Sequence, residues 1–408
     1  MTRIEVVART QVGNGHSVGR LVCHPRLPLV AGLDPERPAV HIWACDAGRL
    51  RDRGSVEAEP GVAAAAWHPH QPLLVVAGES RTVQWTPSGL SEPEGLPSAG
   101  CYDSLAFSPD GRTLWASPSS GDEDDAWERT DALDLASQVV STGPRWDTGV
   151  TEHPGGGLIA TLASDQGATL GLFARIDPET TPASMRMLRR ALVLDADGYE
   201  TPVFSADGRH LAIRGNAYDN SLEVFEFPSL RRVLATTFGE PSPGYPYPQE
   251  WLDRMRAWSR QNIAFGARPG ALWVGTPAGA LMEIDVESGQ AVEHDVFAGT
   301  PVSALGRTPT GELVIASGGG DLVLLSVGAG SPEADGTCGD TPQAAVTAFL
   351  ESTSEVPDNG DLWEHLVTTD GDRTWESDDL ATVTTASEAD PSWLRLQAAV
   401  NTVLNQDK

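Results

Sequence analysis

The chain has 408 residues, of which 57 are acidic and 28 basic, and its formal net charge at pH 7 is −29. This length exceeds what one hydrophobic core usually organises, so we expect two domains or a repeat architecture. The acidic surface repels phosphate backbones and argues against nucleic-acid binding. Because no run of about 18 apolar residues is present and residues 1–19 contain no apolar leader segment, we expect a cytoplasmic protein without membrane contact.

Composition also bears on the source and class of the protein. Lys408 is the only lysine, and this arginine-based composition resembles that of actinobacterial proteins. The 42 glycines and 30 prolines are typical of a turn-rich β protein rather than of a disordered one. The four cysteines have no C-x-x-C spacing, so we interpret them as free thiols; they are Cys23, Cys45, Cys101 and Cys338.

One pattern occurs seven times along the chain: an apolar stretch, a tight turn, a second apolar stretch and a third that often ends in an aromatic residue. The turns lie about 40 to 60 residues apart, near the ~40–45 residues of a four-stranded propeller blade, at positions 25, 69, 109, 154, 206, 267 and 309. First stretches with small side chains, such as 63–66, suit strands that converge on a crowded axis. We therefore predict an all-β fold in which residues 1–330 form a seven-bladed β-propeller.

The two ends of this region are predicted to share a blade. The seventh unit stops after its third apolar stretch, residues 321–327, whereas an unassigned stretch, residues 4–8, precedes the first unit. We expect the N-terminal stretch to be the outer strand of the last blade. The ring is then closed by both ends of the domain, and no long strand edge stays unpaired.

Several of these units resemble bacterial WD repeats. Residues 107–111 and 204–208 match the turn between the first two strands of such a repeat. In the first unit, His16 follows a glycine, Asp34 lies in the middle turn and Trp43 ends the third stretch, although alanine replaces the aspartate that usually follows the tryptophan. The resemblance implies that these three residues join a buried hydrogen-bond network. It also implies membership of a signalling or defence assembly, but it is nearly silent on activity.

A basic cluster stands out in this acidic chain between the fourth and fifth units. It contains Arg186, Arg189 and Arg190 and precedes an expected outer strand at 191–194. One interpretation is that the arginines pair with surface carboxylates. The other is that they form a docking point for an acidic partner.

An aromatic insertion separates the fifth and sixth units. Pro-rich residues 241–248 include Tyr245 and Tyr247, and the following segment places Trp251 and Trp258 on one face of a predicted short helix. This stripe either packs on the propeller or, since Trp and Tyr are common interface anchors, forms a partner-binding patch.

Metal and catalytic sites are not predicted. The histidines of the His-Pro turns occupy equivalent places in different units, which lie far apart around a ring; they are His24, His68 and His153. The acidic loop 122–125 lacks the alternating spacing of a calcium loop. Among the expected inner strands only Glu152 and Arg307 are obvious charges, and no catalytic or phosphate-binding motif is present. We expect no catalysis, no metal and no cofactor.

The repeat stops after residue 330. Residues 331–340 are interpreted as a linker, and residues 341–408 as an acidic helical module with helices near 343–351, 361–367, 376–387 and 392–405. The last of these carries one apolar stripe from Trp393 to Val403. The strong negative charge of the module leaves two alternatives open: it docks a partner, or it folds back onto the propeller.

Together these patterns favour a non-catalytic scaffold or adaptor that binds protein partners through blade-top loops, the 241–261 insertion or the C-terminal module. The alternatives are a ligand-sensing propeller module and, less favoured, a propeller hydrolase or lyase.

Overall fold

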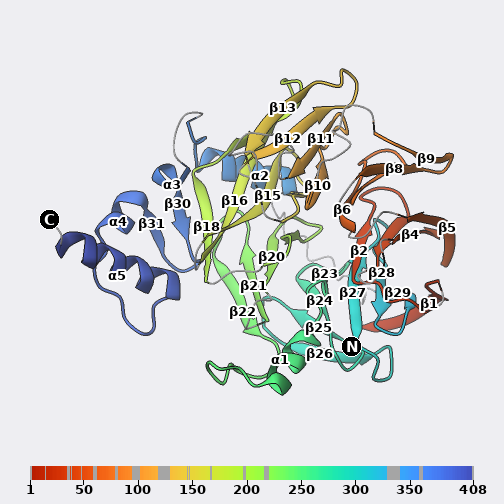
Figure 1. The fold of residues 1–408 in the computed structure, drawn as a ribbon. Coiled ribbons are helices and arrows are strands. Elements are labelled where there is room, and N and C mark those ends of the chain that lie inside the picture. Colours follow the sequence, from red (N-terminus) through yellow and green to blue (C-terminus); the bar gives the residue numbers. More distant parts are fainter. Residues whose placement is uncertain are drawn as a thin grey trace.

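The computed structural model describes residues 2–406 except 14, 35–36, 38, 47, 58–61, 79–80, 94–101, 118–128, 145, 147, 166–167, 196–198, 216–219, 329–340 and 358–361. The predicted linker 331–340, the acidic loop 122–125, Cys101 and Cys338 therefore lie outside the described residues. The described strands form seven sheets, in which neighbouring strands are antiparallel except for one parallel pair in the fourth sheet (Figure 1). The molecule is thus mainly β structure, as the sequence predicts.

The first three sheets follow one another along the chain, each with four strands in sequence order. The first contains β2 (Arg20–Cys23), β3 (Leu29–Leu33), β4 (Ala39–Asp46) and β5 (Arg49–Glu57). The second contains β6 (Val62–Trp67), β7 (Leu74–Gly78), β8 (Thr82–Thr86) and β9 (Gly89–Ser91). The third contains β10 (Ser104–Phe107), β11 (Thr113–Ser117), β12 (Arg129–Asp134) and β13 (Val140–Pro144).

The fifth and sixth sheets have the same order, and helix α1 (Gln249–Arg256) lies in the connection between them. The fifth contains β19 (Val203–Phe204), β20 (His210–Arg214), β21 (Ser221–Glu226) and β22 (Arg232–Thr237). The sixth contains β23 (Ile263–Phe265), β24 (Ala271–Gly275), β25 (Ala280–Asp285) and β26 (Ala291–Asp295).

The seventh sheet combines the N-terminal strand with strands from about 300 residues later. It contains β27 (Val302–Arg307), β28 (Leu313–Ser317), β29 (Asp321–Gly328) and β1 (Arg3–Gln11). The outer strand β1 pairs with β29 from Arg3 opposite Gly328 to Gln11 opposite Asp321. The side chains of Arg9 and Asp321 form an ion pair of 2.7 Å across this edge. The N-terminal stretch therefore lies where the repeat pattern predicts it.

The fourth sheet departs from this regularity at its outer edge. Its inner strands are β14 (Thr151–Glu152), β15 (Leu158–Asp165) and the long β16 (Ala168–Asp177). Two short strands share the free edge of β16: β17 (Ser184–Met187) pairs with one end and β18 (Arg190–Asp195) with the other. The segment from β17 to β18 contains the basic cluster identified in the sequence.

The C-terminal segment extends this same sheet. It contains α2 (Pro342–Glu351), α3 (Leu362–His365), β30 (Val367–Thr369), β31 (Thr374–Glu376), α4 (Ser377–Thr382) and α5 (Ser392–Gln406). Strand β30 pairs in parallel with β18 and antiparallel with β31. The predicted helical module therefore also includes a β-hairpin, and its second and third predicted helices are shorter than expected.

Within the described ranges, the buried apolar side chains form eight clusters. Seven of them lie at successive junctions between sheets, including one at which Val30 and Trp43 of the first sheet meet Val314 and Leu324 of the seventh. Because strands in the middle of these sheets bury both faces, they are mainly apolar; all five residues of β28 are buried, and four of them are aliphatic. The eighth cluster joins the fourth sheet to the C-terminal segment.

Candidate interaction site at the edge of the fourth sheet

The C-terminal segment is attached to the fourth sheet through backbone hydrogen bonds. Beside β17, the amide of Val356 donates to the carbonyl of Met187 over 2.8 Å, and the amide of Arg189 donates to the carbonyl of Ser354 over 2.9 Å. Beside β18, the amide of Val367 donates to the carbonyl of Arg189 over 2.6 Å. A second segment of the same chain therefore forms backbone hydrogen bonds with an open strand edge. The same kind of hydrogen bonding occurs when a peptide adds a strand to a sheet.

The basic cluster lies at this attachment, where one carboxylate receives two arginines. The guanidinium of Arg175 donates from Nε and Nη2 to Oε1 of Glu355, over 2.8 and 2.5 Å. Nε of Arg186 donates to Oε2 of the same carboxylate over 3.2 Å. These hydrogen bonds and charges hold the pKa of Glu355 below its ordinary value. Glu355 therefore stays ionised in the folded state and links β16 and β17 to the C-terminal segment.

The other two arginines of the cluster also contact the C-terminal segment. Nε of Arg189 donates to the carbonyl of His365 over 2.8 Å. Arg190 donates from Nη1 to the hydroxyl of Ser352 over 3.0 Å, and its guanidinium lies 5.4 Å from the ring centre of Phe349. Burial lowers the pKa of Arg190. The structure therefore brings Arg186, Arg189 and Arg190 together around residues of the acidic module of their own chain.

Helix α2 belongs to the core between the fourth and fifth sheets. Phe349 is 0% exposed and packs 4.9 Å from Phe173 and 5.0 Å from Phe227, measured between ring centres. The hydroxyl of Thr341 caps the helix by accepting the amide of Ala344 over 3.2 Å. The sequence left two roles open for the C-terminal module, docking a partner or folding back onto the propeller. The contacts of α2 are those of a segment that folds back onto the sheets.

Helix α5 is fixed at its N-terminus by the end of β18. The carboxylate of Asp195 accepts the amides of Ser392 and Trp393 over 2.8 and 3.3 Å and also contacts the Ser392 hydroxyl. A carboxylate in this position satisfies amides that have no partner within the helix and complements the helix dipole. Trp393 packs edge-on against Trp375, with 5.0 Å between ring centres. The inner face of α5 is therefore positioned from two strands.

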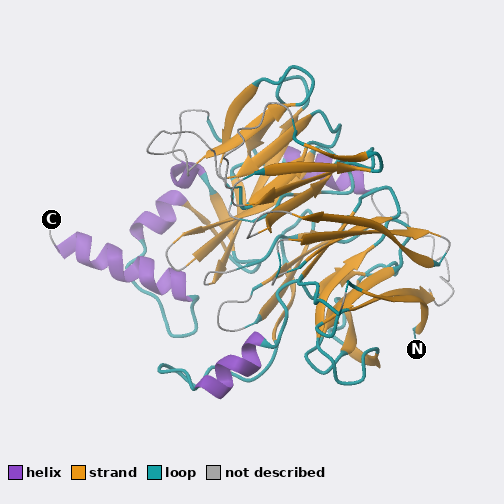
Figure 2. Cartoon of the chain, turned by 45° about the vertical axis from the view of Figure 1, so that its right-hand side comes forward, coloured by secondary structure: helices purple, strands orange, loops and turns teal. Residues whose placement is uncertain are grey.

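The outer face of α5 is apolar and exposed. Leu396, Val400, Val403 and Leu404 expose 52, 44, 58 and 55% of their surface, whereas Trp393, Leu394 and Ala398 on the inner face are buried. Figure 2 shows α5 at the periphery, with its C-terminal end directed away from the sheets. The apolar stripe predicted from Trp393 to Val403 is therefore covered at its first residue, where Trp393 packs on Trp375, and is exposed at Leu396, Val400 and Val403.

The aromatic insertion forms a stack that leads from the core to the surface. Trp251 is buried on α1, Tyr247 stacks on it with 5.1 Å between ring centres, and Tyr245 meets Tyr247 edge-on at 6.1 Å. Trp258 stacks separately on Phe238 at 5.0 Å. The two tryptophans therefore pack against the protein, and Tyr245, which is 88% exposed, is the part of the predicted patch that faces solvent.

The three residues singled out by the WD-repeat resemblance lie near one another in the first sheet region. Asp34 is buried and accepts the amide of Arg37 over 3.2 Å. Trp43 is buried, and the imidazole that stacks on it, at 5.8 Å between ring centres, is His41. His16 is half-buried next to Gly13. His41 was not predicted from the sequence. The available signal was its position two residues before Trp43, which places both side chains on the same face of one strand.

The histidines of the His-Pro turns connect neighbouring sheets. Nε2 of His24 lies 3.0 Å from the carbonyl of Gln71 in the second sheet, and Nε2 of His153 lies 2.9 Å from the carbonyl of Gly208 in the fifth. His68 makes the corresponding contact with Gly111. In each case Nδ1 accepts one or two backbone amides of its own turn. Each of these three imidazoles is therefore neutral and donates a hydrogen bond from Nε2 to a carbonyl of the next sheet region, at three separate places in the fold.

Of the two charged residues expected on the inner strands, Glu152 is exposed and Arg307 is half-buried. Desolvation by the surrounding protein raises the pKa of Glu152, against the lowering effects of the Gly157 amide and the charge of Arg26. Burial lowers the pKa of Arg307. Among the residues that the structure describes, no cluster of three or more His, Cys, Asp or Glu side chains is arranged to hold a metal ion, and no helix is long and apolar enough to cross a membrane.

A comparison of the chain with protein-family models and with curated proteins finds no match to either. The function therefore has to be argued from the residues of the site.

Proposed function

We propose that this chain is a non-catalytic scaffold built on a seven-bladed β-propeller of the WD-repeat type, which binds a protein partner through the outer face of α5. Support for the propeller comes from seven sheets that each contain at least three strands paired in sequence order, and from the buried cluster at each junction between sheets. Support also comes from β1, which completes the last sheet, because a ring closed by both ends of the repeat region is typical of this architecture.

The observation that carries the proposed binding role is the outer face of α5. Its four aliphatic side chains recur at the three- and four-residue spacing of one helix face. Contiguous exposed apolar surface of this kind marks interaction sites in soluble proteins. The inner face is already bound to β18 and β31, so the helix is held in place before a partner arrives. A preorganised helix loses less conformational freedom on binding.

The surroundings of this face indicate the chemistry of the partner. Arg395 is the only charged residue in α5, while Asp378 and Asp379 of α4, the helix packed against α5, are exposed. A partner that fits offers an apolar groove or helix with basic residues at its rim, because opposite charges at the rim favour encounter and exclude acidic competitors. The excess of acidic residues in the whole chain favours the same class of partner.

The test replaces Leu396 and Val403 with serine and measures which proteins co-purify with the chain from its native cells. We expect the double variant to keep its melting temperature and to lose its partner, because both side chains are exposed in the free protein. A matched control replaces Val139 and Val140, exposed aliphatic residues at the edge of the third sheet, and should retain the partner. If both double variants retain the same proteins, α5 is not the binding element.

Tyr245 provides a second surface for the same scaffold role. Replacing it with alanine removes an exposed ring without disturbing Trp251 beneath Tyr247. Retention of the partner by the Tyr245→Ala variant and its loss by the α5 variant would assign binding to α5 alone, whereas the opposite pattern would assign it to the insertion.

A further inference from the structure

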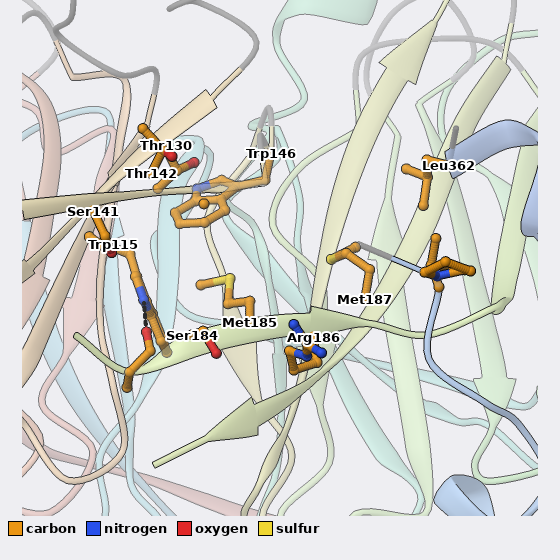
Figure 3. Close-up of a pocket in the computed structure, with 15 residues that line it drawn as sticks. Trp115, Thr130, Ser141, Thr142, Trp146, Ser184, Met185, Arg186, Met187 and Leu362 are labelled. Carbon is orange, nitrogen blue, oxygen red and sulfur yellow. Dashed lines mark hydrogen bonds between the residues drawn. The ribbon is translucent and has the colours of Figure 1, made fainter. Parts of the chain in front are cut away.

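The arginines of the basic cluster differ in the charges that surround them. Arg186 lies at a cavity of about 440 Å³ between the third sheet, β17 and the C-terminal segment, where Figure 3 shows it among the lining residues. Its charge is balanced by the carboxylate of Glu355, 3.2 Å away. Arg190 differs, because its hydrogen-bond acceptors among the described residues are a hydroxyl and a carbonyl, which are both neutral.

The guanidinium of Arg190 lies where three elements meet. Nη1 donates over 3.0 Å to the hydroxyl of Ser352, the residue that caps the C-terminus of α2. Nη2 donates to the carbonyl of Ser229 in the turn between β21 and β22. The backbone amide of Arg190 donates to the hydroxyl of Thr353 over 3.2 Å. One arginine therefore links β18 to the end of α2 and to the fifth sheet.

The positive charge at this junction has no balancing negative charge. Burial lowers the pKa of Arg190. Arg9 shows the opposite behaviour, because its hydrogen bond to Asp321 raises its pKa. An arginine without a carboxylate stands out in a chain of 57 acidic and 28 basic residues. Since a partly buried charge is costly unless it is paired, an anion at this place would stabilise the junction.

Ser352 is placed to carry that anion. The residue is exposed, although its hydroxyl lies within hydrogen-bond distance of the guanidinium. Among the hydrogen bonds between described residues, this is the one in which an arginine donates to a side-chain hydroxyl. A phosphoryl group on this oxygen carries a charge of about −1.5 to −2 at pH 7 and adds three acceptor oxygens. A guanidinium binds such a group through two parallel N–H donors.

We propose that Ser352 is a phosphorylation site and that its phosphoryl group pairs with Arg190. A protein kinase transfers the γ-phosphoryl group of ATP to the Ser352 hydroxyl. The bond between the serine oxygen and the γ-phosphorus forms, and the bond between the γ-phosphorus and the oxygen that bridges to the β-phosphorus breaks. ADP leaves, and the hydroxyl proton passes to the solvent.

Two effects of opposite sign act on the phosphorylated residue. The C-terminus of a helix disfavours negative charge, and phosphorylation also removes the hydrogen bond of 2.7 Å that the Ser352 hydroxyl donates to the carbonyl of Phe349. Against this, two hydrogen bonds between ions replace one between Arg190 and a neutral hydroxyl, and each is roughly twice as strong as a neutral one. The helix-dipole effect is screened by salt at an exposed position. Phosphorylation therefore tightens the attachment of α2 to β18.

The modification also has a consequence for α5. The N-terminus of α5 is held by Asp195 at the end of the same strand, β18. A tighter junction therefore makes the C-terminal segment, and α5 with it, more firmly attached to the fourth sheet. This regulation of partner binding rests on the function proposed for α5, whereas the pairing of phosphate with Arg190 does not.

The first experiment is mass spectrometry of the chain isolated from its native cells during growth and during starvation. We expect a phosphoryl group on Ser352 in at least one of the two states. A chain that is unmodified at Ser352 in both states would overturn the proposal.

The second experiment introduces phosphoserine at position 352 of the full chain and measures amide hydrogen exchange. The amide of Val356 donates to the carbonyl of Met187 across the attachment. We expect its protection to rise about tenfold on phosphorylation, as expected for one charge-assisted hydrogen bond, and not to rise in the Arg190→Gln chain. Phosphorylation of the exposed Ser88, whose hydroxyl contacts Thr86, is the control and should leave the protection of Val356 unchanged.

A second variant keeps the test decisive if Arg190→Gln disturbs folding. Arg190→Lys retains the positive charge without the two parallel donors, so the rise in protection should be smaller than in the wild type and larger than in the Ser88 control. Equal protection of Val356 in the modified and unmodified wild-type chains would contradict the pairing, and so would an equal rise in the wild type and both arginine variants. A rise in protection without any change in partner capture would leave the pairing intact and would count against the role of α5.

Discussion

Two kinds of junction hold this molecule together, and they use opposite protonation chemistry. Between sheets, His24 and His153 reach across as neutral imidazoles, and burial lowers the pKa of both. At the edge of the fourth sheet, Glu355 must be ionised to hold Arg175 and Arg186. The histidine junction occurs between several pairs of neighbouring sheets, each with an apolar cluster beside it. The Glu355 junction occurs where the C-terminal segment joins the fourth sheet. The comparison indicates that the two junctions respond to acid in different pH ranges.

The largest loss of stability is expected in the apolar core between the fourth and fifth sheets, which both His153 and helix α2 contact. Phe349→Ala removes a fully buried ring that α2 inserts between the fourth and fifth sheets. We expect a loss of about 3–5 kcal/mol in the free energy of unfolding, because the cavity left behind adds to the lost burial. Denaturant unfolding measures it, and Leu404→Ala on the exposed face of α5 is the control, expected within about 0.5 kcal/mol of wild type. Equal effects would mean that α2 does not pack as described.

The junctions between sheets should weaken in mild acid. A folded-state pKa that is lowered means that the unfolded chain binds protons more readily, so the stabilisation is complete above about pH 6.5 and is lost as pH falls through the lowered values. His153→Asn should cost about 1–3 kcal/mol at pH 8, since it leaves the Gly208 carbonyl and Gly155 amide without their partners.

When the pH is lowered from 8 to 5, the His153→Asn variant should lose less stability than the wild type, because it has one buried neutral histidine fewer. Melting temperature recorded across that interval is the measurement. A wild-type curve that is flat over this range would contradict the neutral histidine junctions.

A smaller effect is expected at the N-terminus of α5. Asp195→Ala removes the acceptor of two helix amides that comes from a different element. Loss of a helix cap typically costs about 1 kcal/mol. Because the cap also fixes α5 to β18, amide exchange should accelerate in α5 and stay unchanged in β3. Uniform acceleration in both places would show that Asp195 acts on the whole fold instead.

The smallest effect is expected at the arginine junction. Glu355→Gln removes the charge shared by Arg175 and Arg186, but these side chains are about one-third exposed, so solvent screens them. We expect about 1 kcal/mol or less. The folded-state pKa of Glu355 is lowered, so its contribution is present above about pH 4.5 and disappears as pH falls further. Glu250→Gln, at an exposed carboxylate, is the control. If Glu355→Gln lowers the free energy of unfolding no more than the control does, Glu355 does not stabilise the junction.

The sequence predicted the repeating part of the fold well because its signals are local. Turns such as Asp110-Gly111 and strands such as residues 313–317 are each encoded within a few residues, and the missing strand of the last sheet pointed to β1. The hairpin of β30 and β31 also has a local signal, the β-branched run 367–369 before Asp370-Gly371, but the sequence analysis predicts a helix that ends at residue 367 and no strand after it.

The candidate site was harder to predict because it is made of distant segments. The arginines of the basic cluster were visible, but their partner Glu355 lies about 170 residues further along an acidic chain with many similar carboxylates. The parallel pairing of β18 with β30 has no local turn to announce it. The two-faced character of α5 was hidden for the same reason, since only the position of β18 determines which apolar residues are covered.

The measurement that tests this account most directly is hydrogen exchange of the full chain at pH 7.5, resolved for β16, β30 and α5. The account predicts that amides of residues 367–369 in β30 are protected to a similar extent as those of β16, and that α5 is protected as a folded helix. Exchange of β30 at the rate of an unfolded chain, with β16 still protected, would contradict the attachment of the C-terminal segment to the fourth sheet and with it the presentation of α5.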